Sequence, residues 1–130
     1  MADAPQENSM QIDRRRYRRV PVSPMYSEVL TQRVQGMSIE RQTGHIYDLS
    51  EGGARIELDH PIEVGEGLAV NLRLAGGCTI SAQADVVRLY DDCDDPGPRR
   101  MGIEFKQFLS DRDHQSLLDY LKHEAPRRVA

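Results

Sequence analysis

Hydrophobic and polar residues alternate over several short stretches of this chain, which is the pattern of β-strands that bury one face. The clearest stretch covers residues 68–75, where one side of the strand consists of Leu68, Val70, Leu72 and Leu74. Gly76-Gly77 then predicts a tight hairpin into a second strand over residues 79–90. The inward side chains of that strand are expected to be Ile80, Ala82, Ala84 and Val86.

Weaker patterns predict four further strands. They cover residues 26–35, residues 39–49 with the strongest part at 45–49, residues 54–58 and residues 101–105. In the third of these, apolar positions alternate with Arg55 and Glu57, as in a half-buried strand. The sum is a mainly β fold of about six antiparallel strands, and we expect a small closed or split barrel over residues 25–106.

One C-terminal helix is predicted over residues 111–123. Ser110 is a suitable N-cap residue, and Asp113 follows it at the spacing of a capping box. The apolar stripe of this helix, which should plug or flank the barrel, consists of Leu117, Leu118 and Leu121. Pro126 is expected to mark the end of the helix, which leaves residues 125–130 as a C-terminal tail.

The N-terminal part of the chain lacks such patterns. Residues 1–12 are polar and are expected to form a disordered tail. The following residues up to Val22 are too charged for a core strand, and Pro21 and Pro24 disfavour a helix. We therefore expect an extended arm that enters the domain. At 130 residues the chain has room for one core, and the expected domain covers residues 13–124.

Composition and charge disfavour several classes of protein. No apolar run approaches the roughly 18 residues that a membrane-spanning helix needs, and residues 1–10 lack the core of a signal peptide. The formal net charge of −4 argues against general nucleic-acid binding. Cys78 and Cys93 fit no metal-ligand spacing and are expected to be free thiols in a reducing cytoplasm. We therefore expect a cytoplasmic protein.

Against this acidic background, positive charge is concentrated in one short segment. Five of the six residues in Arg14-Arg15-Arg16-Tyr17-Arg18-Arg19 are arginines. Guanidinium groups bind phosphate oxygens, or the O6/N7 edge of guanine, with two parallel hydrogen bonds. Arg15 and Arg19 are four residues apart, so they lie on the same side of an extended arm. The segment therefore suits an anionic ligand that carries a purine.

A second segment, Asp48-Leu49-Ser50-Glu51-Gly52-Gly53, supplies complementary groups. The two oxygens of Asp48 match the N1–H and N2–H₂ donors of guanine, and the Ser50 hydroxyl can bond to base or phosphate. Gly52 and Gly53 permit positive φ and close backbone approach, so that turn amides can point at a ligand. Taken alone, the arginines are more often a solvated tail or nucleic-acid patch, and the second segment is more often an Asx or Ser turn.

Other polar clusters favour ordinary structural roles. The acidic stretch Asp91-Asp92-Cys93-Asp94-Asp95 lacks glycine and glutamate at the spacing of a calcium loop, which favours a solvated loop. The histidines are scattered without a second ligand at helical spacing, so we expect no metal site. Tyr17 is expected to pack against the barrel rather than to stack on a base. No nucleophile–base pair or carboxylate dyad is visible, and we expect that the protein is not an enzyme.

Together, the two segments resemble the signature of PilZ domains, the bacterial receptors for the second messenger cyclic di-GMP. The residues that match the family's RxxxR and DxSxxG motifs are Arg15 and Arg19, followed by Asp48, Ser50 and Gly53. Gly102-Ile103-Glu104-Phe105 is also similar to the family's final strand. The resemblance covers residues 14–121. It implies a six-stranded barrel, with the arginine motif on the N-terminal arm and DxSxxG between the second and third strands.

The resemblance further implies that the protein binds cyclic di-GMP and needs no cofactor. The ligand-binding residues that it implies are Arg14, Arg15, Arg16, Arg19, Asp48, Ser50, Gly52 and Gly53. In the family, a bulky apolar residue directly before RxxxR disfavours a second ligand molecule; here Arg14 stands there, so two molecules per chain are expected. Repulsion among the arginines predicts an arm that is mobile up to about Val20 and becomes ordered on the ligand, which signals to a downstream protein partner.

Two other functions stay open. A PilZ-like adaptor would bind a protein through its barrel and dock through the arm without any nucleotide. A nucleic-acid-binding small barrel would use the arm as a cationic clamp, but the carboxylate of Asp48 beside the arm would repel a phosphate backbone. Asp48 and Ser50 therefore favour the receptor.

Overall fold

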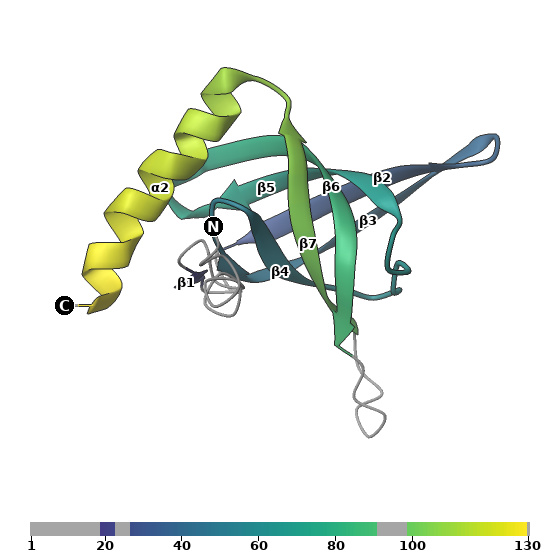
Figure 1. Ribbon diagram of the computed structural model, residues 1–130, viewed down its shortest axis with the longest axis horizontal. Helices are drawn as coiled ribbons and strands as arrows, with labels where there is room; N and C mark the ends of the chain where they lie inside the picture. Colours follow the sequence, from purple (N-terminus) through teal and green to yellow (C-terminus); the bar gives the residue numbers. More distant parts are fainter. Residues whose placement is uncertain (1–18, 23–26, 91–98, 130) are drawn as a thin grey trace, which may run out of the picture.

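The structure of the protein, a computed structural model, describes residues 19–22, 27–90 and 99–129, and side chains up to His123. Six antiparallel strands close into a barrel, and one short strand lies outside it (Figure 1), which confirms the predicted fold class. The barrel strands are β2 (Glu28–Gln35), β3 (Ser38–Leu49), β4 (Gly53–Leu58), β5 (Gly67–Leu74), β6 (Cys78–Tyr90) and β7 (Arg99–Phe108). The remaining elements are the outer strand β1 (Val20–Pro21), the 3₁₀ turn η2 (Ala75–Gly77) and the helix α2 (Asp111–Val129).

The strands follow the order β3-β2-β5-β6-β7-β4 around the barrel, and the pairing of β4 with β3 closes it. β4 and β5 therefore lie on opposite sides of the barrel. On β4, β5 and β6 the apolar side faces the interior, as the alternation predicts. On β2, by contrast, Val29 and Thr31 are buried, whereas Val34 is exposed on the outer side. Buried positions on β4, β5 and β6 are Ala54, Ile56, Leu58, Leu68, Val70, Leu72, Leu74, Ile80, Ala82, Ala84 and Val86.

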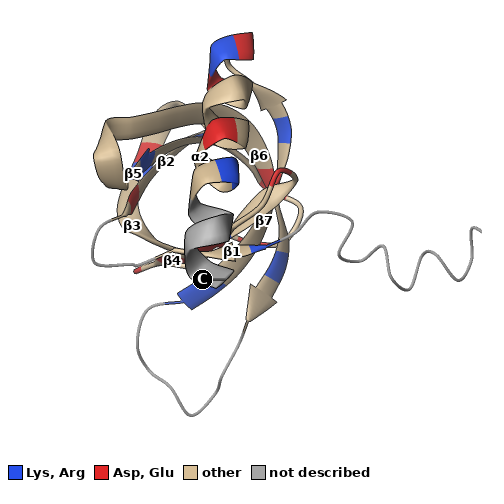
Figure 2. Cartoon of the chain, turned by 90° about the vertical axis from the view of Figure 1, so that its left-hand side faces the viewer, with Lys and Arg blue, Asp and Glu red and all other residues tan. Residues whose placement is uncertain are grey.

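The helix α2 lies across one end of the barrel (Figure 2). Its Leu117 is completely buried in the core, and the other two leucines of the predicted stripe are half-buried. The Ser110 hydroxyl accepts a hydrogen bond from the backbone N–H of Asp113 (3.2 Å) and donates one to its carboxylate (2.7 Å). This geometry confirms the predicted N-cap, and it fixes the start of the helix above the barrel.

The end of the helix differs from the prediction. The helix continues through Pro126 to Val129, so most of the expected C-terminal tail, residues 125–130, is helical. A proline removes one intrahelical hydrogen bond, but its fixed φ of about −65° is that of a helix, so it need not terminate one. The proline is therefore a weaker stop signal here than the sequence suggests.

Two features of the strands also exceed the prediction. β7 spans Arg99–Phe108 rather than residues 101–105, because it pairs with β4 along one edge and with β6 along the other. The β2–β3 hairpin extends beyond the barrel (Figure 1). β2 pairs with β5 only as far as Gln32, and β3 pairs with β4 only from His45 onward, so the end of the hairpin projects from the barrel.

The described end of the N-terminal arm is part of the fold. Val20 is 2% exposed and pairs with Leu49, and Pro21 pairs with Asp48. The expectation that the chain is mobile up to about Val20 is therefore wrong for Val20 itself, because its side chain is buried and its backbone belongs to a sheet. The tail over residues 1–12 and the arginines before Arg19 lie outside the described residues.

Candidate ligand-binding site

Pairing of β1 with β3 brings the end of the arginine segment to the second motif. Arg19 directly precedes β1, and its Nη1 donates a hydrogen bond to Asp48 Oδ1 over 3.0 Å. The Asp48 side chain is 14% exposed and stands at the end of β3, whereas that of Arg19 is 38% exposed. The structure therefore joins two motif residues that sequence analysis assigned to one site.

A second arginine flanks the same carboxylate. Arg55 is the partner of Asp48 in the β3–β4 register, and its Nε lies 3.4 Å from Asp48 Oδ2. This contact is an ion pair by distance but lacks hydrogen-bond alignment, since the Nε of Arg55 is buried without a hydrogen-bond partner among the described residues. Among the described side chains, Asp48 thus accepts an aligned hydrogen bond from Arg19 and makes only a charge contact with Arg55.

Arg55 extends the positive surface toward β6. Its guanidinium carbon lies 5.0 Å from the centre of the Tyr90 ring, and that of Arg88 lies 5.8 Å from the same ring. Gly102 of β7 lies between the two arginines in the sheet, since it pairs with Arg55 on one side and with Arg88 on the other. Two cationic guanidinium groups close to one aromatic ring make a surface on which a base can stack or a phosphate can bind.

These three residues were missed by the sequence analysis. Arg55 stands at an outward position of a predicted strand, but nothing in the sequence says that it faces Asp48. Arg88 and Tyr90 come from a strand that is distant along the chain and reach the site only through the registers of β4, β7 and β6. Knowledge of these registers was the missing signal.

A neighbouring row of side chains on the same face is already neutralised. Arg100 lies over the Tyr47 ring at 4.5 Å, and its Nε is 3.3 Å from Glu57 Oε1. The Tyr47 hydroxyl donates a hydrogen bond to the same Glu57 carboxylate. Burial, and then the bond to Glu57, raise the pKa of Tyr47. This row therefore offers less free positive charge than the Arg55 row.

The Asp48–Gly53 turn is closed by its own serine. Ser50 Oγ accepts hydrogen bonds from the backbone N–H groups of Gly52 (3.3 Å) and Gly53 (3.2 Å), and it donates to Gly53 O (3.3 Å). The hydroxyl and both amides, which were expected to face a ligand, here bond to one another, and Ser50 is only 8% exposed. In this state Ser50 shapes the turn that carries Asp48.

The role expected for the glycines also needs correction. Positive φ in the described residues occurs at Gly36, Gly65, Gly76 and Gly77, and not at the two motif glycines. Gly53 is required for a different reason, because a Cβ at this position would collide with the carbonyl oxygen of Ile103 on β7. Close approach of the β7 backbone therefore explains Gly53, whereas the sequence expectation was close approach to a ligand.

The same turn is connected to the C-terminal helix. Glu51 Oε2 lies 3.3 Å from His114 Nε2 on α2, and the His114 ring stacks on Phe108 at 4.6 Å. The carbonyl oxygen of Gly52 accepts a hydrogen bond from Phe105 N over 2.8 Å. The turn is thereby in direct contact with α2 and β7, so a change in its conformation would affect both elements.

The structure describes five of the eight candidate ligand residues, namely Arg19, Asp48, Ser50, Gly52 and Gly53. The other three, together with Tyr17 and the acidic stretch 91–95, lie outside the described residues. In the described ranges, no group of three or more His, Cys, Asp or Glu side chains is arranged to hold a metal ion. Nor is any helix there long and apolar enough to cross a membrane.

A small antiparallel barrel with a capping helix, an arginine-flanked aspartate and a serine–glycine turn defines the class of protein. The PilZ domain model matches residues 13–123, which is most of the chain, and the chain therefore belongs to the PilZ domain family. This finding confirms the resemblance that the two motifs indicated. No curated protein matches the chain in sequence.

Solved structures of PilZ proteins share the fold. The PilZ domain of YcgR from Escherichia coli, with c-di-GMP, is 19% identical with a TM-score of 0.63, over 88% of this chain and 94% of that chain. The K. pneumonia MrkH–c-di-GMP complex is 19% identical with a TM-score of 0.65, over 84% and 50%. The Bacillus subtilis inhibitor of motility (MotI/DgrA) is 25% identical with a TM-score of 0.61, over 84% and 50%. The chain thus spans about half the length of the last two proteins.

Proposed function

We propose that this protein is a cyclic di-GMP receptor whose ligand binds around Asp48. The observation that carries the proposal is the position of the Asp48 carboxylate between the guanidinium groups of Arg19 and Arg55. Family membership supports the same function, since PilZ proteins of the same fold are known in complex with c-di-GMP. The proposal is for a receptor or adaptor rather than for an enzyme.

The chemistry of the site suits both parts of this ligand. The two phosphodiesters carry negative charge that Arg19 and Arg55 can share, and the arginines before Arg19 add further guanidinium forks. The carboxylate of Asp48 can accept the N1–H and N2–H₂ donors of a guanine, which adenine does not present. The candidate contacts are therefore Arg14, Arg15, Arg16, Arg19, Asp48, Ser50, Gly52 and Gly53, to which the structure adds Arg55, Arg88 and Tyr90.

Ligand binding then orders the arginine segment. The Arg19–Asp48 hydrogen bond already fixes the point where this segment joins the barrel, so the change concerns the residues before Arg19. Two stacked ligand molecules per chain are proposed, with Arg14 covering the outer phosphates or the outer guanine. The altered surface, and the contact of Glu51 with His114 on α2, are what a downstream partner protein would sense.

Calorimetric titration of the purified protein with cyclic di-GMP tests the proposal, with cyclic di-AMP, GTP and a DNA oligomer as controls. We expect cyclic di-GMP to bind much more tightly than any of the three controls, with two molecules per chain, and the second molecule to be lost in Arg14→Leu. No heat with cyclic di-GMP would favour the adaptor that needs no nucleotide. Equal binding of the DNA oligomer would favour the nucleic-acid-binding barrel.

A further inference from the structure

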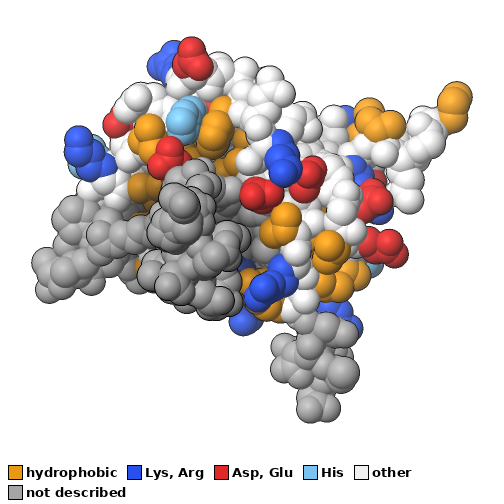
Figure 3. Space-filling model, viewed as in Figure 1, with side chains coloured by type: hydrophobic (Ala, Val, Ile, Leu, Met, Phe, Trp, Pro, Cys, Tyr) orange, Lys and Arg blue, Asp and Glu red, His pale blue; other side chains and the backbone are white. Residues whose placement is uncertain are grey.

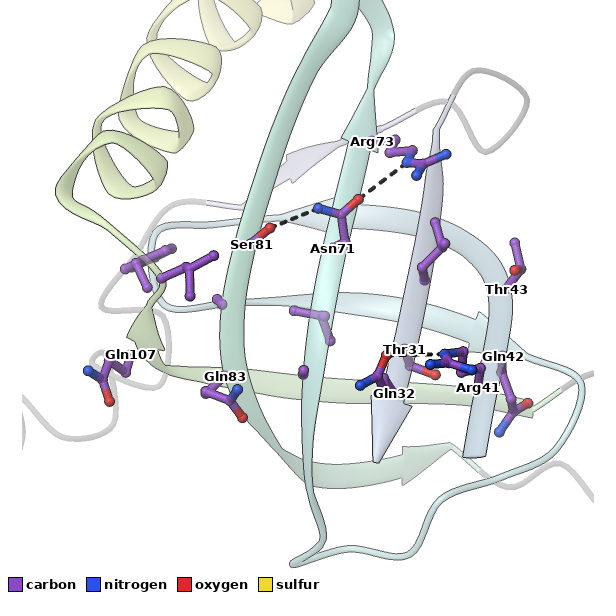
Figure 4. A pocket seen from close by; sticks show the side chains of 16 residues that line it. Thr31, Gln32, Arg41, Gln42, Thr43, Asn71, Arg73, Ser81, Gln83 and Gln107 are labelled. Atoms are coloured by element: carbon purple, nitrogen blue, oxygen red, sulfur yellow. Dashed lines mark hydrogen bonds between the residues drawn. The ribbon is translucent and has the colours of Figure 1, made fainter. Parts of the chain in front are cut away.

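The side of the barrel away from Asp48 carries a trough of about 660 Å³ on the outer face of β5 (Figure 4). Gln32, Ala69 and Gln83 stand side by side across β2, β5 and β6, and the small Ala69 leaves a gap between two amide side chains. Arg41 borders this trough, and its Nε donates a hydrogen bond to Gln32 Oε1 over 3.2 Å (Figure 4). The amide holds the guanidinium in place.

No described carboxylate neutralises the charge of Arg41. Arg19, Arg33, Arg55 and Arg100 each lie within ion-pair distance of a carboxylate, whereas Arg41 has no such carboxylate in the described part of the chain. An exposed guanidinium whose direction is fixed by a neutral amide is suited to bind a carboxylate from another molecule.

Beside Arg41, the projecting β2–β3 hairpin exposes apolar side chains at its end (Figure 3). Val34 and Ile39 are cross-strand partners, 74% and 49% exposed, and Met37 in the turn is fully exposed. Because side chains alternate along a strand, Ile39 and Arg41 share the outer face of β3. An uncovered apolar cluster next to one unpaired charge is unusual on a surface that needs only to be soluble.

Ion pairs connect the two strands of the hairpin to each other and to the loop before β5, and the edge formed by β3 is open. On the other face of the hairpin Arg33 Nε lies 2.7 Å from Glu40 Oε1, and Arg33 Nη1 lies 3.1 Å from Glu66 Oε1 in the loop before β5. Over residues 38–41, the edge of β3 opposite β2 has no strand beside it among the described residues. Such an edge presents backbone N–H and C=O groups to which another strand can add.

We propose that an extended segment of a partner protein adds to β3 at residues 38–41. It places an apolar side chain against the Val34–Met37–Ile39 cluster and a carboxylate on Arg41. Alternate residues of an added strand point to the same face, so the segment carries its apolar and acidic residues two positions apart. The proposal goes beyond the nucleotide site and does not depend on it.

Charge decides against a second copy of this chain as the occupant. In a two-fold pairing of two β3 edges, centring the pair on Ile39 sets Arg41 opposite Met37, which supplies no carboxylate. Centring it on Glu40 or on Arg41 sets like charges directly opposite each other, which is unfavourable. A partner with its own acidic residue supplies a carboxylate for the Arg41 guanidinium, whereas pairing of two copies of this chain does not.

Fluorescence anisotropy with two labelled peptides tests this proposal. The first peptide alternates threonine with isoleucine and glutamate, and the second has lysine in place of glutamate. The wild type should bind the glutamate peptide at least about tenfold more tightly, as expected when one charge pair is lost. Arg41→Glu should reverse this preference, and Ile39→Asp should weaken both peptides. Absence of binding, or equal binding of the two peptides, would overturn the proposal.

Two matched controls locate the effect. Arg73→Glu changes an arginine of the same trough that is held by Asn71 (3.2 Å), and Val87→Asp changes an exposed apolar residue away from the hairpin. Neither should alter peptide binding, and all four variants should keep their affinity for cyclic di-GMP if the wild type binds it. Hydrogen exchange should slow at residues 38–41 on peptide binding. Protection of β5 and β6 instead, or a wild-type dimer that Ile39→Asp dissociates, would show that strand addition by a partner is wrong.

Discussion

The carboxylate of Asp48 accepts a hydrogen bond from Arg19 over 3.0 Å, although 29 positions separate the two residues along the chain. The link exists because β1 places the end of the arginine segment beside the last residues of β3. A ligand phosphate at this site therefore meets an arginine that is already paired. Asp48 orients Arg19 for the ligand, and it also competes with the ligand for that guanidinium.

Asp48→Ala should change the selectivity of the site more than its total affinity. Guanine loses an acceptor for its N1–H and N2–H₂ groups, while Arg19 and Arg55 are released to bind phosphate. Cyclic di-GMP should therefore bind more weakly, and cyclic di-AMP equally or more tightly, as calorimetry of both ligands would measure. Asp85→Asn, which removes a half-buried carboxylate on β6, controls for general charge. An unchanged ratio of the two affinities would leave Asp48 with only a structural role.

Arg19→Ala and Arg15→Ala should each weaken cyclic di-GMP binding without unfolding the protein. One hydrogen bond to a charged group contributes roughly 1.5–3 kcal/mol, which corresponds to about ten- to a hundredfold in affinity. Arg73→Ala is the matched control, since Arg73 is an exposed arginine of β5 on the other side of the barrel. If all three variants bind as the wild type does, the arginine segment has no part in the site.

Gly53→Ala should destabilise the barrel by about 3 kcal/mol or more, because the added Cβ meets the carbonyl oxygen of Ile103. Gly102→Ala should have little effect on stability, since its nearest neighbours would lie at 3.6–3.8 Å, which is ordinary contact. Urea unfolding of both variants measures the difference. If Gly53→Ala is as stable as the wild type but no longer binds the ligand, Gly53 contacts the ligand directly instead.

Local patterns in the sequence were sufficient for most of the fold. Alternation identified β4, β5 and β6 because each strand buries one face, and Ser110 with Asp113 identified the start of α2 because a cap acts within one turn. The length of β7 was underestimated because its outer residues are fixed by pairing partners rather than by apolar side chains. The helix passes Pro126, although the sequence marks a stop there.

The candidate site was predictable only in part, for a similar reason. Asp48 and Arg19 were found because each belongs to a motif with its own chemistry. Arg55, Arg88 and Tyr90 were not found, because ladders between four strands bring them together and no local pattern encodes a register. Likewise, the backbone contact that requires Gly53 comes from a strand far along the chain.

Cys78 should react slowly with thiol reagents at mildly alkaline pH. Burial, and then the negative charge of Asp119, raise its pKa above the ordinary value of a thiol, so less reactive thiolate is present. Iodoacetamide labelling of a Cys93→Ser variant should be slower in the folded protein than in urea. The unfolded chain releases this proton at lower pH, so the free energy of unfolding should also fall as pH rises above the ordinary thiol range. Equal labelling rates in both states would contradict this environment for Cys78.

Ligand should slow amide exchange in the arginine segment and in the Asp48–Gly53 turn, but not in β5. Cyclic di-GMP brings negative charge between these two parts and offsets repulsion among the arginines, whereas Leu68, Val70 and Leu72 are already buried in the barrel. Val20 should be protected with or without ligand, because β1 is paired with β3 before the ligand arrives. Hydrogen exchange with mass spectrometry resolves these regions, and Arg73→Ala again supplies a control that keeps the response. Protection spread evenly over the barrel would contradict ordering of the arginine segment as the signal, and so would protection of residues 14–18 without ligand. The contact between Glu51 and His114 would then be the next place to test.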